Sequence, residues 1–477
     1  MKHSPLTPPA DGLPTPRRYV AIVAIGLGTV LTVIDGAIAT VALPTIARDL
    51  NVDGSAAVLV VTVYQLVLVM SLLPLSALGD IVGLKRLYQA GQMVFTVATV
   101  LCFFAKSLPF LLVVRALQAI GAAAALSVMS ALIRSIYPHK QLGRGLGVNS
   151  VIVSISAALA PTAGGLILSI APWPWVFAMG APFAILSLWL GARGLPDVPP
   201  RPHSYDLAGA ILNAAAFGLL IAGLEALVHG SSPVVSAAIV VLGVIFTVLL
   251  VLHEKGEPVP ILPVDLLGRP VLALSTAGAF LSFMASMMLT LSMPFRLQHA
   301  YGLGPSEVGA MLAPWPLTTM IVAPTAGALS DRYPAGLLGG IGMAIATVAL
   351  ILLAWLPPHP DFFDVAWRMA LCGSGFGLYL SPNARLIVGS APRERAAAAG
   401  GLISTTRLTG QTVGATGVAA LLAMGLGTTA APPLIAAGLT VIAGLFSLAR
   451  LRPSMRNPDA TEATAAQPGA QGDVHAA

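Results

Sequence analysis

Apolar stretches of about 20 residues recur along the chain, separated by short breaks such as KSLPF at 106–110 and LPPHPD at 356–361. An α-helix of that length crosses the hydrocarbon core of a bilayer. The stretches begin near residues 19, 56, 87, 109, 145, 173, 207, 234, 270, 306, 337, 366, 396 and 430. The pattern therefore predicts an all-α membrane protein with fourteen transmembrane helices.

The composition indicates that lipid is the solvent. Of the 477 residues, 56% are hydrophobic and 9% are charged, whereas roughly 25% are charged in an ordinary soluble domain. The 25 Lys and Arg residues lie mainly in short segments without interleaved aromatic residues, which argues against a nucleic-acid partner. Cys102 and Cys372 both lie in apolar stretches, so we expect neither a disulfide framework nor a cysteine metal site.

The positions of Lys and Arg predict the orientation. If both termini are cytoplasmic, most basic residues between the helices lie on the cytoplasmic side, as the positive-inside rule requires. The opposite side then keeps little beyond Arg48, Lys106 and Arg296. The first apolar stretch is longer than the core of a cleaved signal peptide, so we expect the first helix to be retained.

A weak internal repeat divides the chain. SALGDIVGLKR at 76–86 and GALSDRYPAGL at 327–337 each place Leu two residues before Asp, and Asp80 and Asp331 are 251 residues apart. Small residues of the fifth stretch recur in the thirteenth at an offset of 254, where Gly147, Ser156 and Ala160 match Gly401, Gly410 and Gly414. The repeat predicts two six-helix bundles with two extra helices between them.

The predicted organisation has five parts. They are a cytoplasmic N-terminal tail at 1–18, a bundle at 19–198, two extra helices with linkers at 199–268, a second bundle at 269–450 and a disordered cytoplasmic tail at 451–477. Parallel repeats of six helices place a substrate site near the bilayer midplane at their interface. This arrangement suits alternating access.

Asp35 is the one carboxylate inside the first apolar stretch, TVLTVIDGAIATVALPTIARD at 29–49, whose last residue is Asp49. We expect Pro44 to close this helix, which places Asp35 about 13 Å inside it at 1.5 Å per residue. A charged acid at such a depth costs about 2.5–3.5 kcal/mol on insertion scales, so function is the default interpretation. We predict that Asp35 carries a coupling proton. The alternative is a structural acid paired with a buried Arg such as Arg115.

Two further arginines have open interpretations. Arg115, early in the fourth stretch, is predicted to change the proton affinity of the acid, or else to reach toward lipid headgroups. Arg407, in the thirteenth stretch, serves a cavity or bonds neighbouring carbonyls. Glu225, near the end of the seventh stretch, is either a second titrating acid or an interfacial residue.

The segment after the second stretch combines Asp80, Gly83, Lys85 and Arg86. An acid there can pair with a helix N-terminus from the other half and hold one access state closed. We predict this latch at Asp80 and at its copy, Asp331. The alternative, a plain turn with cationic anchors, explains Lys85 and Arg86 but leaves both acids unexplained.

Small and polar residues complete the candidate site. Ser156, Ala160 and Gly164 fall on one helix face, so another helix can approach closely there, while Pro161 bends the backbone. Aromatic and amide groups can face large organic cations. The candidates for the substrate cavity, with ordinary packing as the alternative, are Tyr64, Gln65, Gln118, Asn149, Trp315 and Arg407.

With these motifs the sequence resembles the major facilitator superfamily, and within it the fourteen-span drug:proton antiporters of bacteria, over residues 19–450. The segment 76–86 is similar to the signature G-x-L-x-D-x-x-G-x-[RK]-[RK], and RALQAIGAAA at 115–124 is similar to R-x-x-Q-G-x-G-A-A. The stretch around Asp35 is similar to L-D-x-T-I-V-N-V-A-L-P, with Ala37 and Thr40 in place of Thr and Asn. The antiporter signature G-x8-G-x3-G-P-x-x-G-G is similar to the run of Gly147, Ser156, Ala160, Pro161, Gly164 and Gly165, in which the small residues Ser and Ala replace two glycines.

The resemblance implies a major facilitator fold and a proton-coupled exporter of lipophilic, cationic drugs or toxic metabolites, acting as a monomer in the bacterial cytoplasmic membrane. Its partners would be a small-molecule substrate, protons and the lipid bilayer, and the small-residue seam would keep exchange free of leaks. The alternative is an importer or exporter of one metabolite. The chain lacks a G-x-x-x-x-G-K-[ST] loop, and HEKGE at 253–257 does not match H-E-x-x-H, so we expect neither a cofactor nor enzymatic activity.

Overall fold

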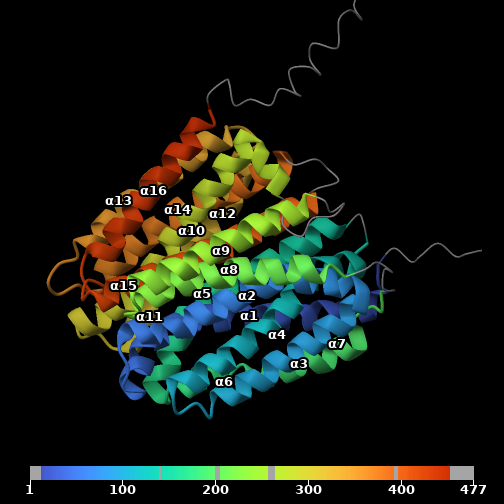
Figure 1. Cartoon of the computed structure of the whole chain (residues 1–477), viewed down its shortest axis with the longest axis horizontal. Helices are drawn as coiled ribbons and strands as arrows, with labels where there is room; N and C mark the ends of the chain where they lie inside the picture. The colour runs from blue at the N-terminus through green and yellow to red at the C-terminus, as the bar shows by residue number, and fades with distance from the viewer. Residues whose placement is uncertain (1–11, 139–140, 199–204, 256–263, 391–395, 452–477) are drawn as a thin grey trace, which may run out of the picture.

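The computed structural model describes residues 12–138, 141–198, 205–255, 264–390 and 396–451, and every regular element in those ranges is a helix (Figure 1). Most of the two predicted tails therefore lies outside the described residues. The first bundle consists of α1 Thr15–Asp49, α2 Gly54–Val82, α3 Leu84–Cys102, α4 Leu108–Ile136, α5 Leu142–Ile170, α6 Pro174–Ala178 and α7 Ala181–Gly194.

The second bundle follows a short turn, η2 (Val264–Gly268), and has the same plan. It consists of α10 Pro270–Phe295 with its extension η3 Arg296–Ala300, α11 Pro305–Leu312, α12 Pro314–Leu329, α13 Ala335–Ala354, α14 Phe362–Ser390, α15 Ala396–Ala423 and α16 Ala431–Ala449. Helix α1 packs against α5 and α7, as α10 packs against α15 and α16. The pair α3–α4 likewise corresponds to α13–α14. Equivalent helices thus have equivalent neighbours in the two bundles.

A helical hairpin covers one side of the junction between the bundles (Figure 1). It consists of α8 (Leu207–Val228), which is capped by Asp206, and α9 (Pro233–Glu254), which is capped by Ser232. Helix α8 packs against α2 of the first bundle and α15 of the second. The outer face of α9 exposes a row of large apolar side chains, including Val234, Val241, Val248 and Leu252.

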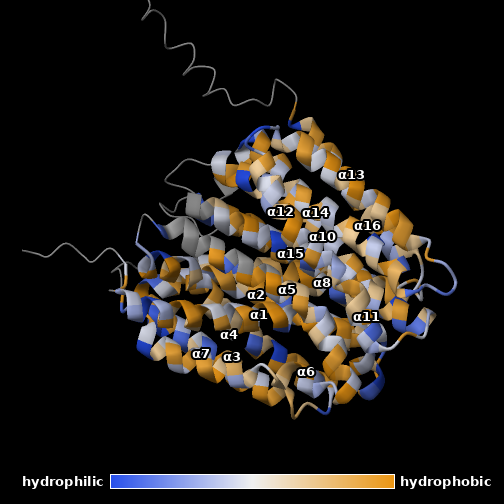
Figure 2. Cartoon of the chain, turned by 180° about the vertical axis from the view of Figure 1, so that it is seen from behind, coloured by the Kyte–Doolittle hydropathy of each residue, from blue (hydrophilic) through white to orange (hydrophobic). Residues whose placement is uncertain are grey.

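The outer surface is that of a membrane protein. Hydrophobic residues run along the helices in Figure 2, and many large apolar side chains are exposed. Nine helices in the described part of the chain are long and apolar enough to cross a bilayer. They are α1, α2, α4, α6 with α7, α8, α9, α10 with its extension, α13 and α16. The protein is therefore multi-pass.

Pro44, expected at a helix end, lies inside its helix instead, and so does Pro294. Helix α1 continues through Pro44 to Asp49, and α10 continues through Pro294. Membrane helices tolerate proline because neighbouring groups and local changes of helical pitch satisfy the freed carbonyls. After Pro294 the helix widens to the π-helical turn η3. Asp35 consequently lies farther from the helix end than the sequence pattern indicates.

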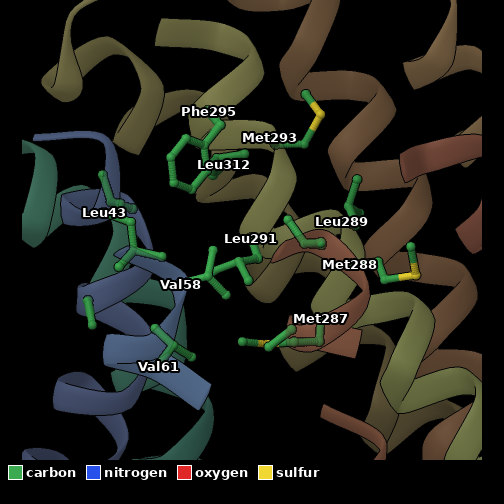
Figure 3. Packing of buried hydrophobic residues seen from close by; sticks show 14 of the residues in the cluster. Leu43, Val58, Val61, Met287, Met288, Leu289, Leu291, Met293, Phe295 and Leu312 are labelled. Carbon is green, nitrogen blue, oxygen red and sulfur yellow. The ribbon is translucent and has the colours of Figure 1, made fainter. Parts of the chain in front are cut away.

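The hydrophobic core shows where the bundles meet. At the end where α1 and α10 finish, a single buried cluster joins both bundles. We call the part drawn in Figure 3 the apolar seal: Leu43, Val58 and Val61 of α1 and α2 face Met287, Leu291 and Phe295 of α10. At the opposite end each bundle has a separate cluster, around Leu84 and Ile136 in the first and around Leu272 and Ile387 in the second. Among the described residues, the buried clusters at that opposite end thus do not join the two bundles, whereas the apolar seal does.

Candidate functional site

A buried ion pair joins α1 and α4 in the first bundle. Nη1 of Arg115 donates to Oδ2 of Asp35 at 2.6 Å. Arg115 is fully buried, and 8% of the Asp35 side chain is exposed. The guanidinium therefore points inward to the acid, and the alternative in which it reaches lipid headgroups does not describe this state.

Gln118 supports the ion pair from the same helix face, since residues three apart on a helix are neighbours. Its Nε2 donates to Oδ1 of Asp35 at 2.9 Å and to Thr99 at 3.0 Å, and its Oε1 accepts from Nη1 of Arg115 at 2.5 Å. Both oxygens of Asp35 are thus bonded. Gln118, predicted as a cavity residue, lies fully buried in this network instead.

Aromatic rings enclose the guanidinium. The rings of Tyr64 on α2 and Phe177 on α6 lie 4.2 and 5.0 Å from its central carbon. Its Nε donates to the carbonyl of Val60 at 3.3 Å, while Nη2 has no hydrogen-bond partner among the described residues. Phe177 and Thr99 are not marked by any motif, so the sequence gives no signal for their place beside this ion pair.

Arg407 lies near the middle of α15, and its side chain is exposed. Thr416, nine residues further on, bonds to Glu225 of α8. At about 100° per residue, nine residues reach the opposite helix face, so Arg407 points away from the peripheral hairpin. Gly410 of α15 packs against Phe280 of α10. Arg407 therefore faces the space between the bundles, and no described residue forms a hydrogen bond or ion pair with it.

The other cavity candidates make different contacts. Asn149 on α5 accepts a hydrogen bond from Thr29 of α1 at 3.2 Å, so it lies between two helices. Nε2 of Gln65 lies 3.8 Å from the sulfur of Met287, across the junction between the bundles. The Trp315 ring packs edge-on against Phe376, and its Nε1 has no partner among the described residues.

The small-residue seam of α5 contacts both bundles. Gly164 lies against Ile38 of α1, and Gly165 lies against the backbone of α11 at Pro305. A Cβ added at Gly309 of α11 would meet the carbonyl oxygen of Pro161. Ser156 and Ala160 are buried on the same helix, and Gly147 lies in a turn of α5 whose surroundings are not described. The seam therefore closes the same end as the apolar seal.

The two predicted latch acids lie at the end of the molecule opposite the apolar seal. Gly83, with a φ of 104°, forms the turn between α2 and α3 just after Asp80. Lys85 pairs with Asp197 at 3.2 Å, and Arg86 is exposed. Asp331 pairs with Arg385 of α14, which belongs to the same bundle. The described partner of Asp331 therefore differs from the expected one, a helix of the other bundle.

Replacing Asp331 by Asn tests whether this pair serves the transport cycle. The side chains of Asp331 and Arg385 are 58% and 56% exposed, so their loss should cost under about 1 kcal/mol of stability. We expect unchanged thermal stability with severalfold slower transport at matched protein levels. Transport at the wild-type rate would show that the ion pair has no role in the transport cycle.

A second feature of the sealed end is a cavity of about 1050 Å³. It shares Phe295 with the apolar seal, and its polar lining includes Arg48, Asp53, His229, Gln298 and His299. The predicted cavity residues do not line it. The molecule thus combines a buried ion pair, one sealed end with a polar pocket, and lipid-facing outer surfaces, features of a multi-pass membrane transporter.

Comparison with known proteins identifies the family. The sequence matches the family model described as Major Facilitator Superfamily over residues 25–415 and 276–472. The chain belongs to the major facilitator superfamily, a family of transporters rather than enzymes.

Named relatives cover most of the chain. It is 45% identical to the uncharacterized transporter YebQ of Escherichia coli, over 93% of this chain and 97% of that protein. It is 30% identical to the multidrug resistance protein Stp of Mycobacterium tuberculosis, over 87% and 78% of the two chains. It is 26% identical to the riboflavin transporter RibZ of Clostridioides difficile, over 82% and 85%.

A solved structure shares the fold. A bacterial homologue of the human lysosomal transporter Spinster, in an inward-facing and unoccupied conformation, superposes with a TM-score of 0.67. The two sequences are 19% identical over 92% of this chain and 97% of that chain. The likeness shows the major facilitator fold.

Proposed function

We propose that this protein is a proton-coupled antiporter that exports lipophilic, cationic compounds by alternating access across a bacterial cytoplasmic membrane. In this proposal the chain spans the membrane fourteen times, acts as a monomer, and has both termini in the cytoplasm. The bundles at 19–198 and 269–450 move relative to each other, with 199–268 between them. The relative Stp, named for multidrug resistance, supports the export of drugs.

The ion pair between Asp35 and Arg115 carries the proposal. An acid whose two oxygens are both bonded by Arg115 and Gln118 holds α1 and α4 in one arrangement. A proton on Asp35 removes the charge that binds Arg115, so protonation and helix arrangement are linked. Each proton that enters across about 100 mV supplies roughly 2.3 kcal/mol. This energy can drive the export of a compound against its gradient.

The structure fits the inward-open stage of such a cycle. The apolar seal lies at the end that the distribution of Lys and Arg assigns to the outside, and the separate cores lie at the end assigned to the cytoplasm. In the opposite stage the proton would reach Asp35 from outside while the substrate leaves. After the return, the proton would leave to the cytoplasm and substrate would bind.

Ethidium accumulation in cells tests this function. Cells that make the protein should accumulate less ethidium than cells that lack it, and an uncoupler should remove the difference. Equal accumulation by both strains, across a panel of lipophilic cations, would contradict drug export. A difference that persists with the uncoupler would contradict proton coupling.

A second candidate function is the transport of one metabolite that carries an anionic group. Arg407 favours it, because an exposed guanidinium without a described partner, facing the space between the bundles, is suited to bind a carboxylate or phosphate. The relationship to a riboflavin transporter is compatible with a metabolite substrate.

Variants of Arg407 separate the two candidates. If an anion binds there, wild-type everted vesicles should take up carboxyfluorescein, Arg407→Leu should abolish that uptake, and Arg407→Lys should retain part of it. If drug export is correct, wild-type vesicles should take up ethidium and exclude carboxyfluorescein.

A further inference from the structure

The extra hairpin carries a buried carboxylate that the proton site at Asp35 does not involve. Glu225 lies in the last turn of α8, and 9% of it is exposed. Thr416 of α15 donates to its Oε1 at 2.5 Å. This acid therefore links the hairpin to a helix of the second bundle.

The second carboxylate oxygen, Oε2, is buried and accepts no hydrogen bond from any described residue. Nδ1 of His229 lies 3.5 Å from Oε2 and 2.9 Å from the backbone carbonyl of Glu225. His229 also lines the 1050 Å³ cavity at the sealed end. The imidazole of His229 thus stands between a polar cavity and a buried acid.

The surrounding helices add few charges. Their titratable groups point elsewhere: Tyr64 of α2 lies against Arg115, His253 and Glu254 lie at the far end of α9, and Arg407 lies on the opposite face of α15. Arg48, Asp53 and His299 line the cavity together with His229. Among the described residues, His229 is therefore the basic side chain that faces Glu225.

We propose that Glu225 is a second proton-carrying group, which receives its proton from the polar cavity through His229. The inference rests on the proposed proton-coupled transport. Nε2 of neutral His229 takes a proton from solvent in the cavity, and the ring passes its Nδ1 proton to Oε2 of Glu225, which breaks the hydrogen bond from Nδ1 to the backbone carbonyl of Glu225. The ring is then neutral with its proton on Nε2, and exchange of ring protons with the cavity solvent restores the starting tautomer. The new O–H bond displaces no hydrogen bond at Oε2, and the bond from Thr416 to Oε1 remains. The charge of the junction between α2, α8 and α15 changes with each transfer.

Glu225→Gln is the direct test. Gln keeps the volume, and its Oε1 still accepts from Thr416, but its amide cannot release a proton. In proteoliposomes with an internal pH dye, we expect the variant to transport ethidium while moving one proton fewer per molecule. Glu254→Gln, at the other end of the hairpin, is the matched control and should keep the wild-type ratio.

Thr416→Val distinguishes a proton carrier from a simple clamp. This change removes the hydrogen bond but keeps the acid, so the proton-to-ethidium ratio should stay at the wild-type value. A wild-type ratio in Glu225→Gln would overturn the inference, as would an equal defect in Glu225→Gln and Thr416→Val. If the wild-type protein itself moves ethidium without protons, the proposed function fails and the inference fails with it.

Discussion

Asp35→Asn is expected to lower the stability of the protein and to abolish efflux driven by a pH gradient. The change leaves the Arg115 guanidinium fully buried without its counter-charge. Removing one member of a buried ion pair typically costs about 3–5 kcal/mol. A lower melting temperature in detergent should therefore accompany the loss of transport, and the single variant cannot separate the two causes.

The double variant Asp35→Asn with Arg115→Gln separates them. It removes both charges, so thermal stability should recover much of the loss, while coupled transport stays absent because no titrating acid remains. The matched control is Asp364→Asn with Arg368→Gln, which removes the ion pair of the equivalent helix α14. That control should retain efflux. Recovery of pH-driven efflux in the first double variant would make Asp35 a structural acid only.

Gly309→Ala is expected to reduce transport at least severalfold by opening the sealed end. The new Cβ would lie against the backbone carbonyl of Pro161, which cannot move aside as a flexible side chain can. Helices α5 and α11 must therefore separate. Gly438→Ala on α16 is the control, because nothing lies within 4 Å of its Cβ position. It should be neutral or slightly stabilising, since Ala favours helix over Gly by roughly 1 kcal/mol.

Labelling of the apolar seal reports the structural effect of Gly309→Ala. Leu43 is fully buried in the seal, and the native Cys102 and Cys372 are also buried. In a Leu43→Cys background, Gly309→Ala should increase reaction with an impermeant maleimide added outside the cell. Equal labelling with and without the alanine would show that the seam tolerates the extra methyl group.

Asp35 could be identified from sequence because it is the one acid in a long apolar stretch, and burial of a charge is costly. Its partner could not be chosen, because Arg115 is 80 residues away and periodicity gives no contact between distant helices. Gln118 shows the same limit. The sequence marks it as polar in an apolar helix, but only packing decides between a cavity wall and the ion-pair network.

The small residues of α5 could be predicted to allow a close helix contact, whereas the identity of that helix, α11, depends on how the bundles meet. Pro44 predicts too early an end for α1, and Pro294 likewise lies inside α10, because lipid and neighbouring helices allow a helix to continue through proline. The sequence leaves two interpretations of Arg407 open, because only the packing of α15 against α8 and α10 fixes which helix face carries it.

The most direct test of the central claim is proton release on substrate binding. Purified protein in weakly buffered detergent, with a pH dye present, should release protons when ethidium is added, because substrate binding and protonation at Asp35 exclude each other in an antiporter. The double variant of Asp35 and Arg115 should bind ethidium and release fewer protons than the wild type. Equal proton release by both proteins, with ethidium bound to each, would contradict the assignment of Asp35 as the coupling site.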